Sequence, residues 1–215
     1  VLRFFAGPIV HRINPLGLLL LSAVLATIGL YMLGSVATGA AILVAGTIYG
    51  IGKTFFWPTM LAVVSERFPK GGALTLGAVG GVGMLSAGLL GGPGIGYKQD
   101  YFTTEALQRE NPAVYQEYVA DNTQGFLFFD EVTGMDGAKV GALLERDPSG
   151  MTPSELETKA ILEDVSIRGG QTALRWTALV PLTMVLGYIL LLLYFRTRGG
   201  YRAIELETEQ GSKGT

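Results

Sequence analysis

The sequence predicts an all-α fold, a polytopic bundle of membrane helices with a long acidic insertion outside the bilayer. Of its 215 residues, 49% are hydrophobic and 16% are charged, whereas a soluble domain carries about 25% charged residues. The charge is also segregated, because residues 1–96 contain one acid, Glu66, and residues 97–171 contain fourteen acids against six bases. Apolar stretches joined by polar ones are typical of a multi-pass membrane protein.

Four stretches are long and apolar enough to be membrane spans, which need about 20 residues to cross a hydrocarbon layer of about 30 Å. They are residues 16–34, 38–64, 73–96 and 172–195. Backbone groups in lipid must be paired internally, so each is expected to be a helix. Residues 1–10 are too short to cross and are expected to end a further span whose beginning is missing.

Basic residues in the short connections predict the orientation. They are Arg12, then Arg67 and Lys70, and finally Arg196, Arg198 and Arg202. The carboxy terminus is therefore predicted to be cytoplasmic, in an inner or plasma membrane. The expected domains are residues 1–96 (transmembrane helices), 97–171 (the acidic insertion on the outer side, partly helical), 172–195 (the last span) and 196–215 (a cytoplasmic tail).

The acidic insertion, residues 97–171, is too long for a simple connection and is expected to contain some order. Thr152-Pro153-Ser154-Glu155 is a capping box with proline at the first helical position, so a helix is predicted from Pro153 towards Ser166. A second helix is predicted over 103–120 with a break at Asn111-Pro112, and residues 147–150 read as a turn. A small lid over the outer mouth is the preferred interpretation, with partner binding or ion filtering as alternatives.

Glycines recur at spacings of four in the third full span. They are Gly77 and Gly81, followed by Gly88, Gly92 and Gly96. Small residues at this spacing let neighbouring membrane helices approach closely. They are interpreted as helix-packing faces.

Lys53 is the most informative residue, because it lies about 3 Å from the middle of the span 38–64 at 1.5 Å per residue. A lysine there costs about 2.5 to 3.5 kcal/mol on insertion scales and usually faces a water-filled cavity or a partner. Tyr49 and Trp57 lie four residues before and after it, so their rings are expected to line the same path. Pro58 is expected to free a backbone carbonyl and to kink the helix at that level. The alternative is a structural ion pair between Lys53 and a residue in a missing half of the protein, with Tyr49 and Trp57 merely packing.

Arg3 is expected about 10 Å deep in its span at 1.5 Å per residue, where it could join Lys53 in a cationic site for an anionic solute. Other chemistries have little support. The chain has no cysteine and one histidine, His11, so no cofactor and no metal site are predicted. The Gly-Lys-Thr at residues 52–54 lacks the earlier glycine of a nucleotide-binding loop, since residue 47 is threonine. No basic face exists for nucleic acid.

The chain resembles the carboxy-terminal half of a major facilitator superfamily transporter, over residues 1–98 and 172–198. Residues 7–15 keep Gly7 and Arg12 of the family's cytoplasmic motif but have His11, Asn14 and Pro15 at its other defining positions. Residues 3–8 are similar to the end of span eight. Residues 56–59 and 65–69, with the glycine-rich span, resemble spans ten and eleven, including the sugar-permease branch. The family's motif aspartate is absent, so its charge-relay gating is not carried over.

The resemblance implies spans eight to twelve of a twelve-helix, two-bundle carrier that works by alternating access. Its expected partners are a small-molecule solute such as a sugar, sugar acid or organic anion, a coupling proton or sodium ion, the lipid bilayer and the missing amino-terminal bundle. The substrate path is assigned to Lys53, Tyr49, Trp57 and Arg3, and gating or packing to Gly7, Arg12, Pro58, Gly88 and Gly92. An integral membrane enzyme is not predicted, because the spans contain no carboxylate or histidine. The alternative is a membrane-anchored binding module whose outer insertion carries the function.

Overall fold

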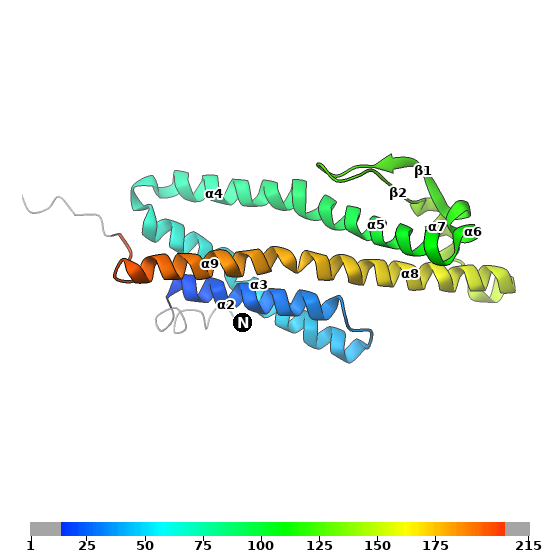
Figure 1. Cartoon of the computed structure of the whole chain (residues 1–215), viewed down its shortest axis with the longest axis horizontal. Helices are drawn as coiled ribbons and strands as arrows, with labels where there is room; N and C mark the ends of the chain where they lie inside the picture. Colours follow the sequence, from blue (N-terminus) through cyan, green and yellow to red (C-terminus); the bar gives the residue numbers. More distant parts are fainter. Residues whose placement is uncertain (1–13, 205–215) are drawn as a thin grey trace, which may run out of the picture. The chain divides into compact units, whose positions relative to one another are not determined.

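The computed structural model describes residues 14–204, a mostly helical stretch with a single short β-hairpin (Figure 1). Arg3, Gly7, His11 and Arg12 lie outside these residues. The elements are α2 (Pro15–Leu33), α3 (Gly39–Arg67), η2 (Pro69–Gly71), α4 (Gly72–Ser86), η3 (Ala87–Gly91), α5 (Gly92–Glu110), α6 (Pro112–Tyr118), β1 (Val119–Gln124), β2 (Val132–Met135), α7 (Gly137–Leu144), η4 (Pro148–Gly150), α8 (Pro153–Thr177) and α9 (Leu179–Thr197).

Among residues 14–204, four helical stretches are long and apolar enough to cross a membrane, as the sequence predicts. They are Pro15–Leu33, Gly39–Arg67, Pro69–Glu110 and Pro153–Thr197. The last two have 42 and 45 residues, about twice the length that a crossing requires. Each of these two therefore continues from a predicted span into the acidic segment, the name used below for Tyr97–Gln171.

The described chain forms two compact units. The first contains residues 14–30, 38–86 and 178–204, and the second contains residues 31–37 and 87–177.

In the first unit, α2 and α3 meet through small residues. A Cβ added at Gly29 would stand 2.5 Å from the Tyr49 nitrogen, and one added at Gly52 would stand 2.7 Å from the Ala26 nitrogen. Ala45, on the same side of α3, is fully buried. The two backbones approach this closely because no side chain stands between them, the arrangement that stabilises helix pairs in lipid.

The connection from α3 to α4 is a tight turn through η2, after which Gly72 has a φ of +48°. Glycine adopts this left-handed conformation without a Cβ clash. The Trp57 ring then lies against α4, where a Cβ at Gly83 would stand 3.1 Å and one at Gly80 would stand 3.7 Å from it. The glycine-rich helix α4 thus accommodates the largest side chain of α3.

The chain after α9 folds back onto the end of α3. The Arg67 guanidinium lies 4.9 Å from the centre of the Phe195 ring and donates a hydrogen bond to the Arg202 carbonyl at 2.9 Å. The Tyr201 hydroxyl donates to Glu66 Oε2 at 2.7 Å. Burial, followed by this bond to the carboxylate, raises the pKa of Tyr201. The basic ends of α3 and α9 therefore lie together, as expected if both are on one side of the membrane, and their assignment to the cytoplasmic side stays a prediction.

In the second unit, α5 and α8 lie side by side and carry the hydrophobic core (Figure 1). The core consists of Leu107, Tyr118, Leu143, Leu162 and Val165. Large apolar side chains of α5, α6, α7 and α8 meet here, so the acidic segment has an interior of its own.

The local signals predicted for the acidic segment are confirmed. Thr152 and Glu155 form the capping box, in which the Thr152 N–H donates to Glu155 Oε2 at 2.8 Å and the Glu155 N–H donates to Thr152 Oγ1 at 3.3 Å. The helix from Pro153 continues beyond Ser166 to Thr177. The predicted break is also present, because α5 ends before Asn111 and α6 begins at Pro112.

The hairpin is an addition to the predicted fold. β1 pairs antiparallel with β2, joining Val119 to Met135 and Gln124 to Val132 with an irregularity between them. The helix predicted over 103–120 therefore ends at Tyr118. The sequence of β1 has no alternation of apolar and polar residues, so its strand form depends on pairing with β2, which itself packs against α5.

Candidate functional site

Lys53 is the central residue of α3, with fourteen residues between it and either end of the helix. At 1.5 Å per residue each end lies about 21 Å away, farther than half of a hydrocarbon layer of about 30 Å. The lysine side chain is exposed on the surface of the first unit. An uncompensated ammonium at this depth would cost about 2.5 to 3.5 kcal/mol, so this face of α3 is the strongest candidate for a polar path.

Lys53 borders the side of α3 that packs on α2, to which Gly52 and the Tyr49 backbone belong, but is itself exposed. The buried residues of α3 are Ala45, Gly52, Phe55 and Thr59. The Lys53 ammonium instead lies 5.9 Å from the centre of the Tyr49 ring. The structure thus brings together Lys53 and Tyr49, two of the residues assigned to the substrate path, as their helical spacing predicts.

Lys53 makes no ion pair with any carboxylate among residues 14–204. Glu66 is the one acid in the described residues of the first unit. It stands thirteen residues further along α3, or about 20 Å at 1.5 Å per residue, and it accepts the bond from Tyr201. The charge of Lys53 is therefore uncompensated within the described part of this unit.

Trp57 lies one turn beyond Lys53 on α3 and is 39% exposed. Its ring contacts the backbone surface of α4 at Gly80 and Gly83. Much of the Trp57 side chain is therefore involved in packing on α4, which is the alternative role predicted for it.

Pro58 lies inside α3, which continues through it as a helix from Gly39 to Arg67. Because proline has no N–H, it cannot donate to the carbonyl four residues earlier, which is that of Thr54. The Thr54 hydroxyl itself donates back to the Gly50 carbonyl at 2.7 Å. A backbone acceptor without its helical donor therefore lies directly after Lys53.

Gly88 lies within the π-helical turn η3, and Gly92 is the first residue of α5. A Cβ added at either position would meet no other group within 4 Å among the described residues. Gly77, Gly81 and Gly96 are equally open, so the packing role given to this spacing stays a prediction. Close helix contacts occur instead at glycines outside this spacing, among them Gly29, Gly52, Gly83 and Gly169.

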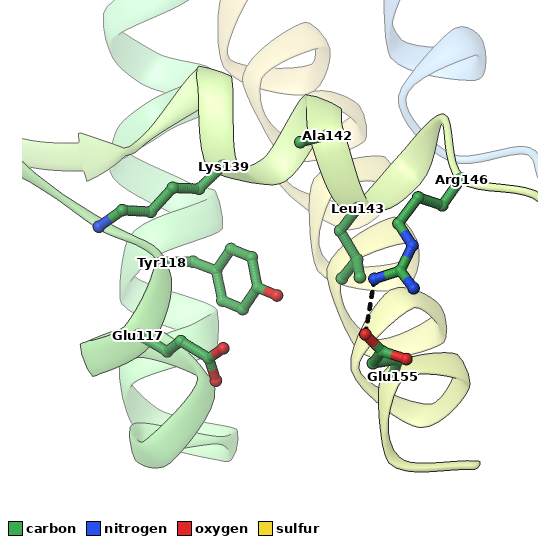
Figure 2. Close-up of a pocket in the computed structure, with 7 residues that line it drawn as sticks. All are labelled: Glu117, Tyr118, Lys139, Ala142, Leu143, Arg146 and Glu155. Carbon is green, nitrogen blue, oxygen red and sulfur yellow. Dashed lines mark hydrogen bonds and ion pairs between the residues drawn. The ribbon is translucent and has the colours of Figure 1, made fainter. Parts of the chain in front are cut away.

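The acidic segment contains a pocket of about 310 Å³ beside its hydrophobic core. It is lined by Glu117, Tyr118, Lys139, Ala142, Leu143, Arg146 and Glu155. Figure 2 shows the Tyr118 hydroxyl pointing toward the ion pair of Arg146 with Glu155, in which Nη1 and Oε1 are 2.6 Å apart. Burial, followed by the charges of Glu117 and Glu155, raises the pKa of Tyr118.

The charge of this pocket is largely balanced. The Thr152 N–H, the Thr152 hydroxyl and then Arg146 lower the pKa of Glu155 by hydrogen bonding to its carboxylate. Lys159 holds the adjoining end of α7 by donating to the carbonyls of Leu144 at 2.6 Å and Arg146 at 3.2 Å. The pocket is suited to a small polar group that can bond to a hydroxyl, an ammonium and a carboxylate.

A second cavity, of about 400 Å³, lies between α5 and α8 and carries three arginines, Arg109, Arg168 and Arg175. Its charge is internally satisfied at Arg168, which donates to both carboxylate oxygens of Glu110 at 2.9 and 2.6 Å and pairs with Asp164 at 2.9 Å. These bonds lower the pKa of Glu110. The ion pairs of Arg168 beside this cavity therefore have a structural role, because they join α5 to α8.

No group of three or more histidine, aspartate or glutamate side chains able to hold a metal ion occurs among residues 14–204. The prediction that the protein needs no metal or cofactor stays a prediction. The chain matches no protein-family model, no curated protein and no solved structure. Its likeness to the major facilitator superfamily therefore remains a prediction from the sequence.

Proposed function

We propose that the protein is a secondary active transporter of a small polar organic solute, with the Lys53 face of α3 as one wall of the solute path. The single observation that supports this most is an exposed lysine at the centre of a helix long enough to span a membrane, without an ion pair in the described residues. A helix that served only as an anchor would have no reason to bear this insertion cost.

The second support is the division of α3 into two faces. One face is fixed to α2 through Gly29 and Gly52, where backbone atoms approach closely. Lys53 is exposed in the described part of the first unit, as expected if a further bundle of helices completes the path. A rigid seam on one side and an open polar face on the other suit a bundle that rocks against its partner in alternating access.

The chemistry of this face favours a solute with both a flat or ring-shaped surface and a negative charge. The ammonium of Lys53 would pair with a carboxylate, and the rings of Tyr49 and Trp57 would stack against a sugar-like ring. The Thr54 carbonyl, which Pro58 cannot cap, would accept a bond from a hydroxyl or bind a coupling cation, in the way that unpaired carbonyls do in broken transporter helices. The solute class proposed is therefore a sugar acid or related organic anion, coupled to a proton or sodium ion.

Uptake by proteoliposomes that contain the full-length protein tests this proposal. D-Glucuronate serves as the charged probe and D-glucose as the neutral one, with a proton or sodium gradient imposed. Lys53→Met is expected to reduce uptake of the acid by about tenfold or more, since a hydrogen bond to a charged group contributes about 1.5 to 3 kcal/mol. Neutral uptake should change much less.

Lys70→Met is the matched control, because Lys70 is an exposed lysine in the turn η2 after α3. It should transport both probes like the unaltered protein, and Lys53→Arg should retain part of the acid uptake. Equal uptake by Lys53→Met and Lys70→Met would refute the assignment of the path.

The alternative function, a membrane-anchored binding module, is favoured by one observation. The acidic segment has its own hydrophobic core and a pocket of about 310 Å³ lined by charged groups and the Tyr118 hydroxyl. If the full-length protein takes up neither probe and its Arg146→Ala variant loses the capture of a ligand that Lys53→Met retains, the module becomes the better account.

A further inference from the structure

The tip of the β1–β2 hairpin exposes three large apolar side chains in succession. Leu127 is 65% exposed, Phe128 is 85% exposed and Phe129 is 45% exposed. These residues belong to the acidic segment, where a lid surrounded by water would present polar groups. A contiguous exposed apolar patch of this kind marks a contact surface for another molecule or for a membrane.

The tip is held against α5 by defined contacts. The Phe126 ring lies 3.1 Å from the position of a Cβ on Gly94, and the Tyr97 hydroxyl donates a hydrogen bond to the Asp130 carbonyl at 2.7 Å. The Tyr97 and Phe129 rings lie 5.8 Å apart. Gly94 leaves room for the Phe126 ring. The hairpin runs along α5, and its tip lies beside the first turns of that helix (Figure 1).

The backbone of the tip turns its apolar residues outward. Leu127 has a φ of +54° and is the only non-glycine residue with a positive φ among residues 14–204. The left-handed conformation is unfavourable for leucine and persists only where surrounding contacts impose it. Phe126 packs at Gly94 and Phe129 packs partly on Tyr97, while most of the surface of Leu127 and Phe128 is exposed, which is unfavourable in water and favourable beside an apolar phase.

The turns of α5 that hold the tip are also the place where the apolar sequence ends. Residues 73–96 are apolar, and Tyr97 begins a run that continues with Lys98, Gln99 and Asp100. A helix that crosses the bilayer in α4 and the start of α5 would leave the hydrocarbon at this level. Contacts with Gly94 and Tyr97 therefore place the tip at the membrane surface.

Other aromatic residues of the second unit gather at the same turns. Trp176 of α8 is 49% exposed, stacks on Phe102 with ring centres 6.3 Å apart, and has the Lys98 ammonium 5.6 Å from its ring centre. Tryptophan and tyrosine are enriched where a membrane meets water, because their rings have an apolar body and a polar edge. Tyr97 and Trp176 thus mark the boundary independently of the hairpin.

From these contacts we propose that Leu127, Phe128 and Phe129 insert into the headgroup boundary of the leaflet nearest the acidic segment, so that the hairpin anchors this segment to lipid. Asp130 and Glu131 follow the tip directly, so the attraction comes from apolar burial and does not require anionic lipid. The inference rests on the crossing of the membrane by the α4–α5 helix and is independent of transport.

Spin labelling in phosphatidylcholine liposomes tests the insertion. These 215 residues contain no cysteine, so Phe128→Cys in an otherwise cysteine-free full-length protein carries a single nitroxide. Ser154→Cys is the matched control, an exposed position twenty-two residues before Trp176 on α8, about 33 Å along the helix at 1.5 Å per residue. Collisions with dissolved oxygen report lipid, and collisions with a water-soluble nickel chelate report water.

The label at Phe128 should collide preferentially with oxygen and the label at Ser154 with the nickel chelate, giving ratios that differ several-fold. Leu127→Cys, measured in parallel, should give a lipid-like ratio as well and provides a second reading of depth. Nickel accessibility at both tip positions equal to that at Ser154 would overturn the proposal. Low accessibility to both reagents would also overturn it, because a second copy or another protein would then cover the tip.

Discussion

The closest approaches between α2 and α3 occur at small residues, whereas the core of the acidic segment is made of large ones. In the first, backbones approach at Gly29 and Gly52 with alanine around them, so that an added Cβ would stand within 2.7 Å of a backbone atom. In the second, Leu107, Leu162 and Val165 are at most 1% exposed. Both are helix contacts within one short chain.

The difference follows from the solvent expected around each region. In lipid, a leucine gains little by contacting another helix, so close backbone packing of small residues provides the attraction. In water, removal of apolar surface contributes roughly 25 cal/mol per Å², so large side chains are favoured at the contact. Close approach at Gly29 and Gly52 is the kind of contact that a membrane would favour, and the core of the acidic segment is the kind that water would favour.

Helix α8 shows the same change along its own length. Its buried residues, in chain order, are Leu162, Val165, Gly169 and Ala173. Gly169 lies so close to Thr103 of α5 that an added Cβ would clash with its hydroxyl and its backbone nitrogen. Large residues at the contact are thus replaced by small ones as α8 approaches the start of the predicted last span at residue 172.

The largest expected effect comes from truncation in the core of the acidic segment. Leu162→Ala should lower the free energy of unfolding of this segment by about 2 to 5 kcal/mol, because Leu162 is 1% exposed and a cavity would remain. Urea-dependent proteolysis of the protein in liposomes measures the change. Leu156→Ala, at a position 40% exposed on the same helix, should cost less than about 1 kcal/mol. If both substitutions lowered the free energy of unfolding equally, the acidic segment would not be stabilised by a core of large side chains.

The next effect is addition of a methyl group to the α2–α3 seam. Gly52→Ala would place a Cβ 2.7 Å from the Ala26 nitrogen and 2.8 Å from the Ser22 carbonyl oxygen, so the helices must separate at an expected cost of about 1 to 3 kcal/mol. Unfolding of the detergent-solubilised protein by increasing dodecyl sulfate measures it. Gly50→Ala is the control on the same helix, since its Cβ would meet nothing within 4 Å. A seam that tolerates both changes alike would contradict close backbone packing.

A smaller effect is expected at the start of α8. Thr152→Ala removes the hydroxyl that accepts from the Glu155 N–H, and loss of a capping residue typically costs about 1 kcal/mol. Hydrogen exchange of the first turn of α8 should accelerate, while Ser154→Ala, a substitution two residues later, should leave it unchanged. Accelerated exchange in both variants would mean that the capping box contributes nothing specific.

The smallest expected effect is a dependence on acid pH confined to the acidic segment. Hydrogen bonds from the Arg168 guanidinium and from the backbone N–H of Thr152 lower the pKa values of Glu110 and Glu155, respectively. A carboxyl with a lowered pKa stabilises the fold at pH values above its unfolded pKa of about 4.3, and this stabilisation is lost as the pH falls below that value. Hydrogen exchange at pH 7 and pH 3, corrected for intrinsic rates, should show lower protection of α8 at pH 3 than of α2. Glu155→Gln should reduce the difference.

The parts of the fold that the sequence could predict are those set by local chemistry or by the solvent. The four apolar stretches are helical because lipid requires internal backbone pairing, and α8 begins at Pro153 because Thr152 and Glu155 are three residues apart. Lys53 was expected near the middle of its span and is the central residue of α3. Each of these follows from a few neighbouring residues.

The parts that could not be predicted depend on contacts between distant residues. The hairpin pairs Val119 with Met135 and rests on α5, and nothing in the sequence of β1 indicates a strand. Gly29 and Gly52 have no other glycine four residues away, so their spacing did not mark them as contact residues. Gly88 and Gly92 do have this spacing and were predicted to pack, but a Cβ at either would meet no other group among the described residues. Spacing identifies small residues without identifying the helix that they contact.

Cysteine accessibility at residue 53 tests most directly whether the open face of α3 lines an aqueous path. In full-length protein reconstituted in liposomes, Lys53→Cys should react with the membrane-impermeant reagent 2-(trimethylammonium)ethyl methanethiosulfonate, more slowly than Ser65→Cys near the end of α3, and D-glucuronate should slow the reaction. Ala45→Cys, in the fully buried seam, should not react. If Lys53→Cys is as unreactive as Ala45→Cys from both sides of the membrane, residue 53 faces lipid or a dry contact, and the proposed transport path is contradicted.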